Sequence, residues 1–323
     1  MSEAAPSRPP SSAPTIVPSR HSADARRAAT QDTHGGRIVA TVSEIVGEFR
    51  NTSTDGVGAV GLVVPGIVDE ERGIGVRSEN LGWRNVPFRD LVAERTRLPV
   101  AFGHDVVRAG GLAEYRLGAA RNARTALFLP IGTGIAAALI VDGRIHAGGG
   151  YAGEIGHVDV GHGEPCACGS VGCLEAIASA AAIARRYTRA AGTPVPGALE
   201  VADRLRASDP VARRVWDEAV EAFALALSWA ASVLAPEIIV VGGGLAESGD
   251  LLLGPLREAL KRRLTFQRVP RLVPAALGDD AGWLGAALLA RDLLGLSESC
   301  DVASGRRDRH RHPESRARSH IQD

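Results

Sequence analysis

The segment GEIGHVDVGHGEPCACGSVGCLE, residues 153–175, concentrates side chains that bind metals or protons. It holds three of the four cysteines of the chain, two of its nine histidines and three glutamates. The donor set that suits tetrahedral zinc, one imidazole and three thiolates, is supplied by His157, Cys166, Cys168 and Cys173. His162 is a rival fourth ligand. A set of reduced cysteines without any metal is the alternative interpretation.

A zinc ion with four protein ligands has no open position, so this site would be structural. Zinc prefers the nitrogen and sulfur donors already available. The neighbouring carboxylates of Glu154 and Glu175 are therefore free for another task, such as accepting hydrogen bonds from hydroxyl groups.

Asp105 stands where a predicted strand ends and a helix begins, the usual place for functional groups in open α/β sheets. A carboxylate there can act as a general base toward an alcohol. The alternative is an ordinary helix cap.

Two glycine turns follow predicted strands: Gly132-Thr133-Gly134 and Gly242-Gly243-Gly244. Turns of this kind let backbone N–H groups approach a phosphate or a nucleotide. Neither turn matches the phosphate-loop or dinucleotide-binding motifs, so each is weak evidence by itself.

Helical and strand patterns alternate along the chain. Helical spacing starts at Gly36, a buried strand runs up to Pro65-Gly66, and residues 80–99 suggest a loop followed by a short helix. A strand ending at His104 is followed by a helix, and residues 123–149 suggest a hairpin whose two strands are joined by Gly132-Thr133-Gly134. Helices are predicted over 175–190 and 210–234. A strand, a glycine turn and a helix follow. The pattern ends with a strand, a loop and a helix. This alternation predicts the α/β class.

The composition sets outer limits on function. Of 323 residues 45% are apolar, and 37 basic side chains balance 37 acidic ones. The balance argues against a nucleic-acid surface, no apolar run is long enough to span a bilayer, and the cysteine pattern fits a reducing cytoplasm. Residues 1–35 and 298–323 have the composition of disordered ends.

In order along the chain, VGLVVPGIVD, NLGWRNVPF, LPVAFGHD, GTGI, GYAGEIGHVDV, CACGSVGCLE, IIVVGGGL and VPAALGDDAGWLGAALLA resemble the ROK family of bacterial sugar kinases and sugar-responsive repressors. The resemblance implies a two-lobed, actin-like fold of the hexokinase type (ribonuclease H-like). It implies an N-terminal small lobe over residues 36–118 and a C-terminal large lobe with the zinc-binding loop over 119–297.

The resemblance also implies roles for individual residues. Asp105 would be the catalytic base, and zinc on the Cys/His set would stiffen the loop. The sugar would be held by Gly66, Asn80, His104, Asp105, Glu154, His157 and Glu175. Gly132, Thr133 and Gly134 would face the phosphates of ATP with Mg²⁺, and Gly242, Gly243 and Gly244 the adenosine. The family suggests a homodimer or homotetramer.

The sequence departs from the family pattern in three places. No D-x-G-G-T phosphate loop precedes Pro65, so we expect the first N-terminal strands to be missing, replaced by the leader or encoded upstream. His104 replaces an asparagine, and Ala136-Ala137-Ala138 replaces a glycine-richer stretch.

The leading hypothesis is an ATP-dependent sugar kinase of the glucokinase type, acting on glucose. The alternative is a sugar-binding relative with weak or lost activity. A sugar-sensing repressor would need a helix-turn-helix domain, for which the leader is too short and too proline-rich. A zinc-stabilised structural protein is the last candidate, and the presence of Asp105, Glu154 and Glu175 argues against it.

Overall fold

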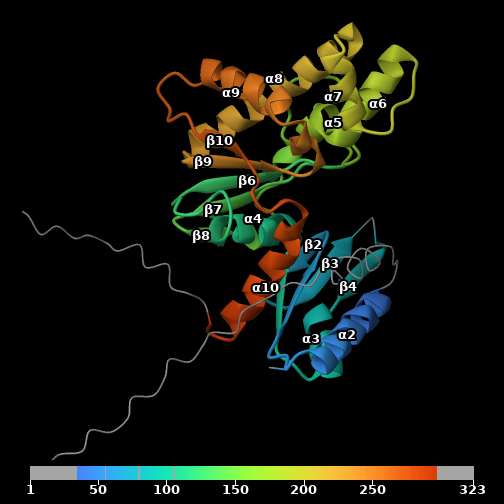
Figure 1. Cartoon of the computed structure of the whole chain (residues 1–323), viewed down its shortest axis with the longest axis vertical. Helices are drawn as coiled ribbons and strands as arrows, with labels where there is room; N and C mark the ends of the chain where they lie inside the picture. The colour runs from blue at the N-terminus through green and yellow to red at the C-terminus, as the bar shows by residue number, and fades with distance from the viewer. Residues whose placement is uncertain (1–34, 55, 79–80, 105, 297–323) are drawn as a thin grey trace, which may run out of the picture.

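The computed structural model describes residues 35–54, 56–78, 81–104 and 106–296 of the chain. Two α/β lobes lie one above the other, with helices α4 (Val106–Arg116) and α10 (Ala281–Leu293) between them (Figure 1). The predicted leader up to residue 34 and the predicted tail lie outside the described residues. Asn80 and Asp105 lie outside them too, as does the side chain of His104.

The small lobe contains two sheets. Strand β1 (Val60–Val64) pairs in parallel with β5 (Val100–His104), and β2 (Ile67–Asp69), β3 (Ile74–Ser78) and β4 (Trp83–Val86) form an antiparallel sheet. Helices α2 (Gly35–Thr52) and α3 (Phe88–Thr96) pack against each other beside these sheets.

Part of the loop that we expected before α3 is strand β4, and that expectation was wrong. The strand is held by tertiary packing that its own polar sequence does not reveal. The buried Trp83 ring meets Phe88 edge to face at 5.3 Å, and Phe88 stacks on Phe102 at 6.0 Å.

The large lobe is built on a five-stranded sheet in the order β10-β9-β6-β7-β8. Strands β6 (Ala126–Pro130), β9 (Ile238–Gly242) and β10 (Arg271–Pro274) are parallel. The predicted hairpin is β6 with the antiparallel β7 (Ala138–Val141), and β8 (Arg144–His146) pairs antiparallel with β7 after the Asp142-Gly143 turn. Strand β9 is buried along its whole length, as its unbroken apolar sequence predicts for a central parallel strand.

Helices α5 (Leu174–Ala178), α6 (Ala180–Ala191), α7 (Ala198–Arg206), α8 (Pro210–Leu234) and α9 (Asp250–Arg263) form the rest of the large lobe. The single helix predicted over 175–190 is in fact α5 and α6. Ser179 breaks it with an extended backbone, and its hydroxyl accepts the Ala182 N–H at 3.1 Å as the cap of α6. No helix in the described part of the chain is long and apolar enough to cross a membrane.

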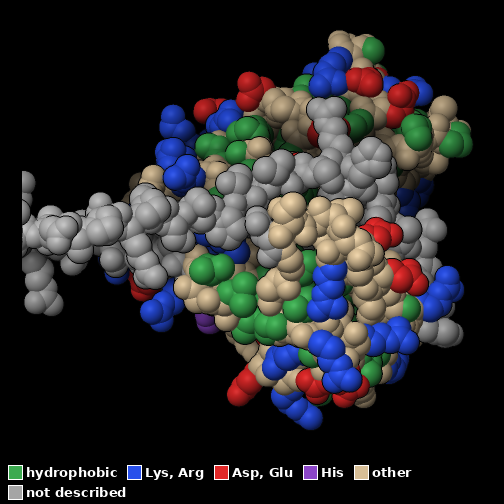
Figure 2. Space-filling model, turned by 60° about the horizontal axis from the view of Figure 1, so that its bottom comes forward, with side chains coloured by type: hydrophobic (Ala, Val, Ile, Leu, Met, Phe, Trp, Pro, Cys, Tyr) green, Lys and Arg blue, Asp and Glu red, His purple; other side chains and the backbone are tan. Residues whose placement is uncertain are grey.

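Helix α10 comes from the end of the described chain but packs on α4, β1 and β5. The approach of the two helices is very close, because a Cβ atom added to Gly285 would lie 1.9 Å from the carbonyl oxygen of Ala109. Arg116 of α4 and Asp292 of α10 form a bidentate ion pair at 2.6 and 2.7 Å. On the face drawn in Figure 2, basic and acidic side chains are mixed over both lobes.

We expect Gly285→Ala to destabilise the protein by about 1–3 kcal/mol, because the added methyl group must push α10 away from α4. Gly47→Ala in α2 is the matched control, since nothing lies within 4 Å of its added Cβ. The control should be neutral or more stable by up to about 1 kcal/mol through helix propensity alone. Urea unfolding of both variants measures the difference, and equal effects would contradict the packing argument.

Candidate functional site

Four side chains of the segment 153–175 converge on one point. The ligand atoms of His157, Cys166, Cys168 and Cys173 all lie within 4.8 Å of one another. Nδ1 of His157 is 3.7 Å from Sγ of Cys166, and the Sγ atoms of Cys168 and Cys173 are also 3.7 Å apart. Metal bonds of about 2.0–2.3 Å place tetrahedral ligand atoms about 3.3–3.8 Å apart. These two pairs therefore have the spacing of a tetrahedral metal site.

Backbone hydrogen bonds fold the segment back on itself and create this convergence. The Leu174 N–H donates to the Val158 carbonyl oxygen at 2.9 Å. As a result Cys173 comes to lie beside His157, with its Sγ atom 3.6 Å from the His157 carbonyl oxygen. The cluster is thus assembled by local chain folding.

The thiols of the cluster differ in electrostatic environment. Burial raises the pKa of the Cys173 thiol to about 12, whereas a hydrogen bond from the Ser170 backbone N–H lowers the pKa of the Cys168 thiol. A buried thiol becomes a thiolate readily only when a cation replaces its proton. The donor set therefore fits a bound metal ion well.

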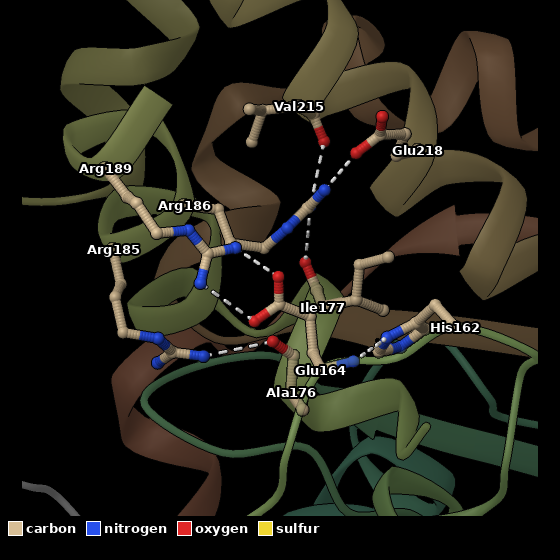
Figure 3. A network of polar contacts seen from close by, with 9 residues as sticks. All are labelled: His162, Glu164, Ala176, Ile177, Arg185, Arg186, Arg189, Val215 and Glu218. Atoms are coloured by element: carbon tan, nitrogen blue, oxygen red, sulfur yellow. Dashed lines mark hydrogen bonds and ion pairs between the residues drawn. The ribbon is translucent and has the colours of Figure 1, made fainter. Parts of the chain in front are cut away.

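A polar network fastens the middle of the segment to helix α6 (Figure 3). The carboxylate of Glu164 accepts two hydrogen bonds from the guanidinium of Arg189, which holds the pKa of that carboxyl below its usual range. Nδ1 of His162 accepts the Glu164 N–H at 3.1 Å. This nitrogen faces the backbone of its own loop, and His162 is not among the four converging ligands.

The two ends of the segment rest against the turn between β6 and β7. Oε2 of Glu175 accepts the Ile135 N–H at 2.8 Å, and the Gly153 carbonyl oxygen accepts the Ala137 N–H at 2.8 Å. A Cβ on Gly153 would lie 1.9 Å from the Ala137 carbonyl oxygen, so only glycine allows this contact. Glu154 follows directly and is exposed. Both predicted sugar-binding carboxylates therefore flank residues 132–137.

The two predicted glycine turns lie side by side. The Ile131 N–H donates to the Gly242 carbonyl oxygen at 2.8 Å, and the Leu245 N–H donates to the Ile131 carbonyl oxygen at 3.1 Å. These bonds join the Gly132-Thr133-Gly134 turn to the turn after β9. Each turn follows a strand as predicted, and the two turns share the carboxyl edge of the large-lobe sheet.

A pocket of about 350 Å³ opens beside the second glycine turn. Its lining residues come from α6, from the start of α7 and from the segment after β9: Ala180, Pro196, Gly197, Ala198, Leu199, Glu200, Gly244, Leu245 and Glu247. Sequence reasoning found only Gly244 of this set. Leu245 ends the IIVVGGGL phrase, but the residues at the start of α7 belong to no motif, and only folding brings them to the β9 edge.

Two of the predicted small-lobe residues, Gly66 and His104, lie at the carboxyl ends of two neighbouring parallel strands. Val64 and His104 are register partners at the ends of β1 and β5, and Gly66 follows β1 with a φ of +120°. A Cβ on Gly150 would lie 2.9 Å from the Val68 carbonyl oxygen, so the strand after Gly66 contacts the large-lobe loop that precedes Glu154. The predicted site therefore draws on both lobes.

Comparison with known proteins supports the family assignment. The ROK family model matches residues 17–293. The glucokinase of Thermotoga maritima is 36% identical over 280 residues, covering 80% of this chain and 85% of its own. The xylose repressor of Caldicellulosiruptor bescii is 28% identical over 260 residues, covering 75% of this chain and 65% of its own.

A solved structure adds a three-dimensional match. The ROK family glucokinase of Streptomyces griseus, crystallised with glucose and AMPPNP, has a TM-score of 0.69 and 30% identity. The match covers 81% of this chain and 90% of the Streptomyces chain. The predicted two-lobed, actin-like sugar-kinase fold is therefore confirmed, and the chain belongs to the ROK family.

Proposed function

We propose that the protein phosphorylates a hexose hydroxyl with ATP, with glucose as the favoured sugar. One observation carries the proposal. The Glu175 carboxylate lies against the Gly132-Thr133-Gly134 turn, next to the pocket beside Gly244. Sugar-binding carboxylates and phosphate-facing glycines then share one edge of the large lobe. Similarity to a glucokinase that binds glucose and AMPPNP supports the same function.

In this proposal the sugar is held mainly by the metal-binding loop. The carboxylates of Glu154 and Glu175 accept hydrogen bonds from sugar hydroxyls. The Nδ1 atom of His157 faces the cluster, which leaves its Nε2–H to donate to a hydroxyl oxygen. Gly66, Asn80 and His104 of the small lobe complete the site from the opposite side.

Asp105 removes the proton from the sugar hydroxyl as that oxygen attacks the γ-phosphorus of ATP. A new oxygen–phosphorus bond forms, the bond from phosphorus to the β–γ bridging oxygen breaks, and ADP leaves. The backbone N–H groups of the first glycine turn orient the phosphates. Mg²⁺ supplies charge neutralisation when it is bound with ATP. Positioning by the chain provides most of the remaining rate enhancement.

We propose zinc as the metal of the Cys/His cluster. Three thiolates and one imidazole suit this ion, and four protein ligands leave no position for a reactive water. The ion would therefore be structural. Its task would be to hold Glu154 and Glu175 in place at the two ends of the loop.

Purified protein should contain about one zinc ion per chain, and Cys173→Ser should reduce this to below about 0.2 because three donors bind zinc far more weakly than four. Elemental analysis by mass spectrometry measures the content. Cys300→Ser is the control, since Cys300 is distant in sequence from the cluster, and it should keep the full content. A folded wild-type protein without zinc would reject the assignment.

A coupled assay with glucose, ATP and Mg²⁺ should show turnover that falls by about 10²–10⁴-fold in Asp105→Ala, as loss of a general base predicts. Asp142→Asn is the matched control, because Asp142 lies in the exposed β7–β8 turn and its ion pair is with the exposed Arg124. If glucose raises the melting temperature but wild type and Asp105→Ala turn over equally slowly, the chain is a sugar-binding relative and the kinase proposal fails.

A further inference from the structure

Two stretches of chain carry the polypeptide between the lobes. The first runs from the end of α4 at Arg116 to β6, and the second runs from β10 to α10 through residues 275–280. Helices α4 and α10 lie between the lobes in the region where these crossovers pass (Figure 1). Both crossovers are bonded to one side chain, that of Glu114, to which neither the site nor the proposed reaction gives a role.

The carboxylate of Glu114 divides its two oxygens between the crossovers. Oε2 accepts the Ala119 N–H of the first crossover at 2.8 Å, and Oε1 accepts the Leu277 N–H of the second at 2.8 Å. The main-chain oxygen of Glu114 also accepts the N–H groups of Gly118 at 3.1 Å and Ala120 at 3.0 Å. One residue thus fixes segments of the chain that lie more than 150 residues apart in sequence.

The chemistry of this contact requires a carboxylate. Glu114 is 0% exposed and forms no ion pair with any of the described residues, so its two buried oxygens depend on these amide donors for hydrogen bonds. A buried carboxylate offers an acceptor to each crossover at once. A glutamine offers one acceptor, and its NH₂ group would face the second N–H donor.

Helix α4 itself is packed against both lobes. A Cβ on Gly111 would lie 2.4 Å from Ala138 Cβ of β7 in the large lobe. On its other side α4 packs on α10 and contacts β5 of the small lobe. Since the predicted sugar residues come from both lobes, binding a sugar would draw the lobes together around this helix.

We propose that Glu114 is a positioning residue at the hinge between the two lobes. It ties both crossovers to α4, so that the lobes open and close about one axis and bring Glu154 and Glu175 to the strand ends of β1 and β5. This inference rests on the proposed function in one respect: closure would serve phosphoryl transfer by excluding water from the reacting phosphate.

The test is a single-molecule energy-transfer measurement on the full chain, with dyes attached through unnatural amino acids at Glu48 of α2 and Lys261 of α9, both exposed. Wild type should give a narrow distribution of interlobe distances without ligand and a shift to shorter distance with glucose. Glu114→Gln should broaden the ligand-free distribution and reduce the glucose shift by at least about half, because one crossover is released.

Asp292→Asn is the matched control, since it weakens the α4–α10 ion pair without touching either crossover. It should leave the distribution unchanged. Hydrogen exchange provides a second readout: at least one of the amides of Ala119 and Leu277 should exchange at least about tenfold faster in Glu114→Gln, and neither should in Asp292→Asn. If Glu114→Gln does not fold, Glu114→Asp takes its place, because the shorter side chain can reach only one crossover.

A wild-type distance distribution in the Glu114 variant would overturn the hinge role, even if hydrogen exchange at the two amides increases. If Asp292→Asn broadens the distribution of interlobe distances as much as Glu114→Gln does, the hinge role is also overturned. Helix packing in general would then explain the broadening. Absence of kinase turnover in wild type would reject the proposed function alone. The ligand-free distance distribution would still decide whether Glu114 sets the hinge.

Discussion

In the Cys/His cluster, donor atoms from the two ends of one loop meet within 4.8 Å, and the geometry of the proposed sugar site depends on that contact. A hydrophobic core holds little of this loop: Ile155 and Val160 pack against the large-lobe core, but most residues between Glu154 and Ser170 are polar or glycine and at least partly exposed. Its shape instead comes from the cluster, from its own backbone ladder and from the Glu164–Arg189 ion pair. Glu154 and Glu175 stand at the two ends of this restrained segment, so whatever fixes the cluster also fixes the distance between them.

The large lobe and the small lobe each contribute one sheet edge to the proposed site. Buried parallel strands β6 and β9 end in the two glycine turns, and the bonds between Ile131 and the β9 turn keep those turns together. Strands β1 and β5 of the small lobe end in register at Val64 and His104. Phosphoryl transfer needs the two edges to face each other, and the crossovers that join at Glu114 are the part of the chain that can control this orientation.

Much of this arrangement was predictable from sequence, because it rests on local patterns. The C-x-C-x4-C spacing is enough to identify the ligand cluster, and the apolar run Ile238–Val241 is enough to place a central strand. Other features depend on partners that are distant in sequence. The strand at Trp83 is held by packing of its ring on Phe88, which itself stacks on Phe102. The α7 residues of the pocket belong to no motif. The predicted roles of Asn80 and Asp105 remain proposals, since both residues lie outside the described part of the chain.

The central claim is that the carboxylates of the Cys/His loop hold the sugar, and calorimetric titration of glucose tests it most directly. Glu154 is exposed, so Glu154→Gln should leave the fold intact. Glu44→Gln, on the exposed face of α2, is the control. Loss of a charged hydrogen bond worth about 1.5–3 kcal/mol predicts that Glu154→Gln binds glucose at least about tenfold more weakly than wild type and than Glu44→Gln. Equal affinities in all three proteins would contradict the account.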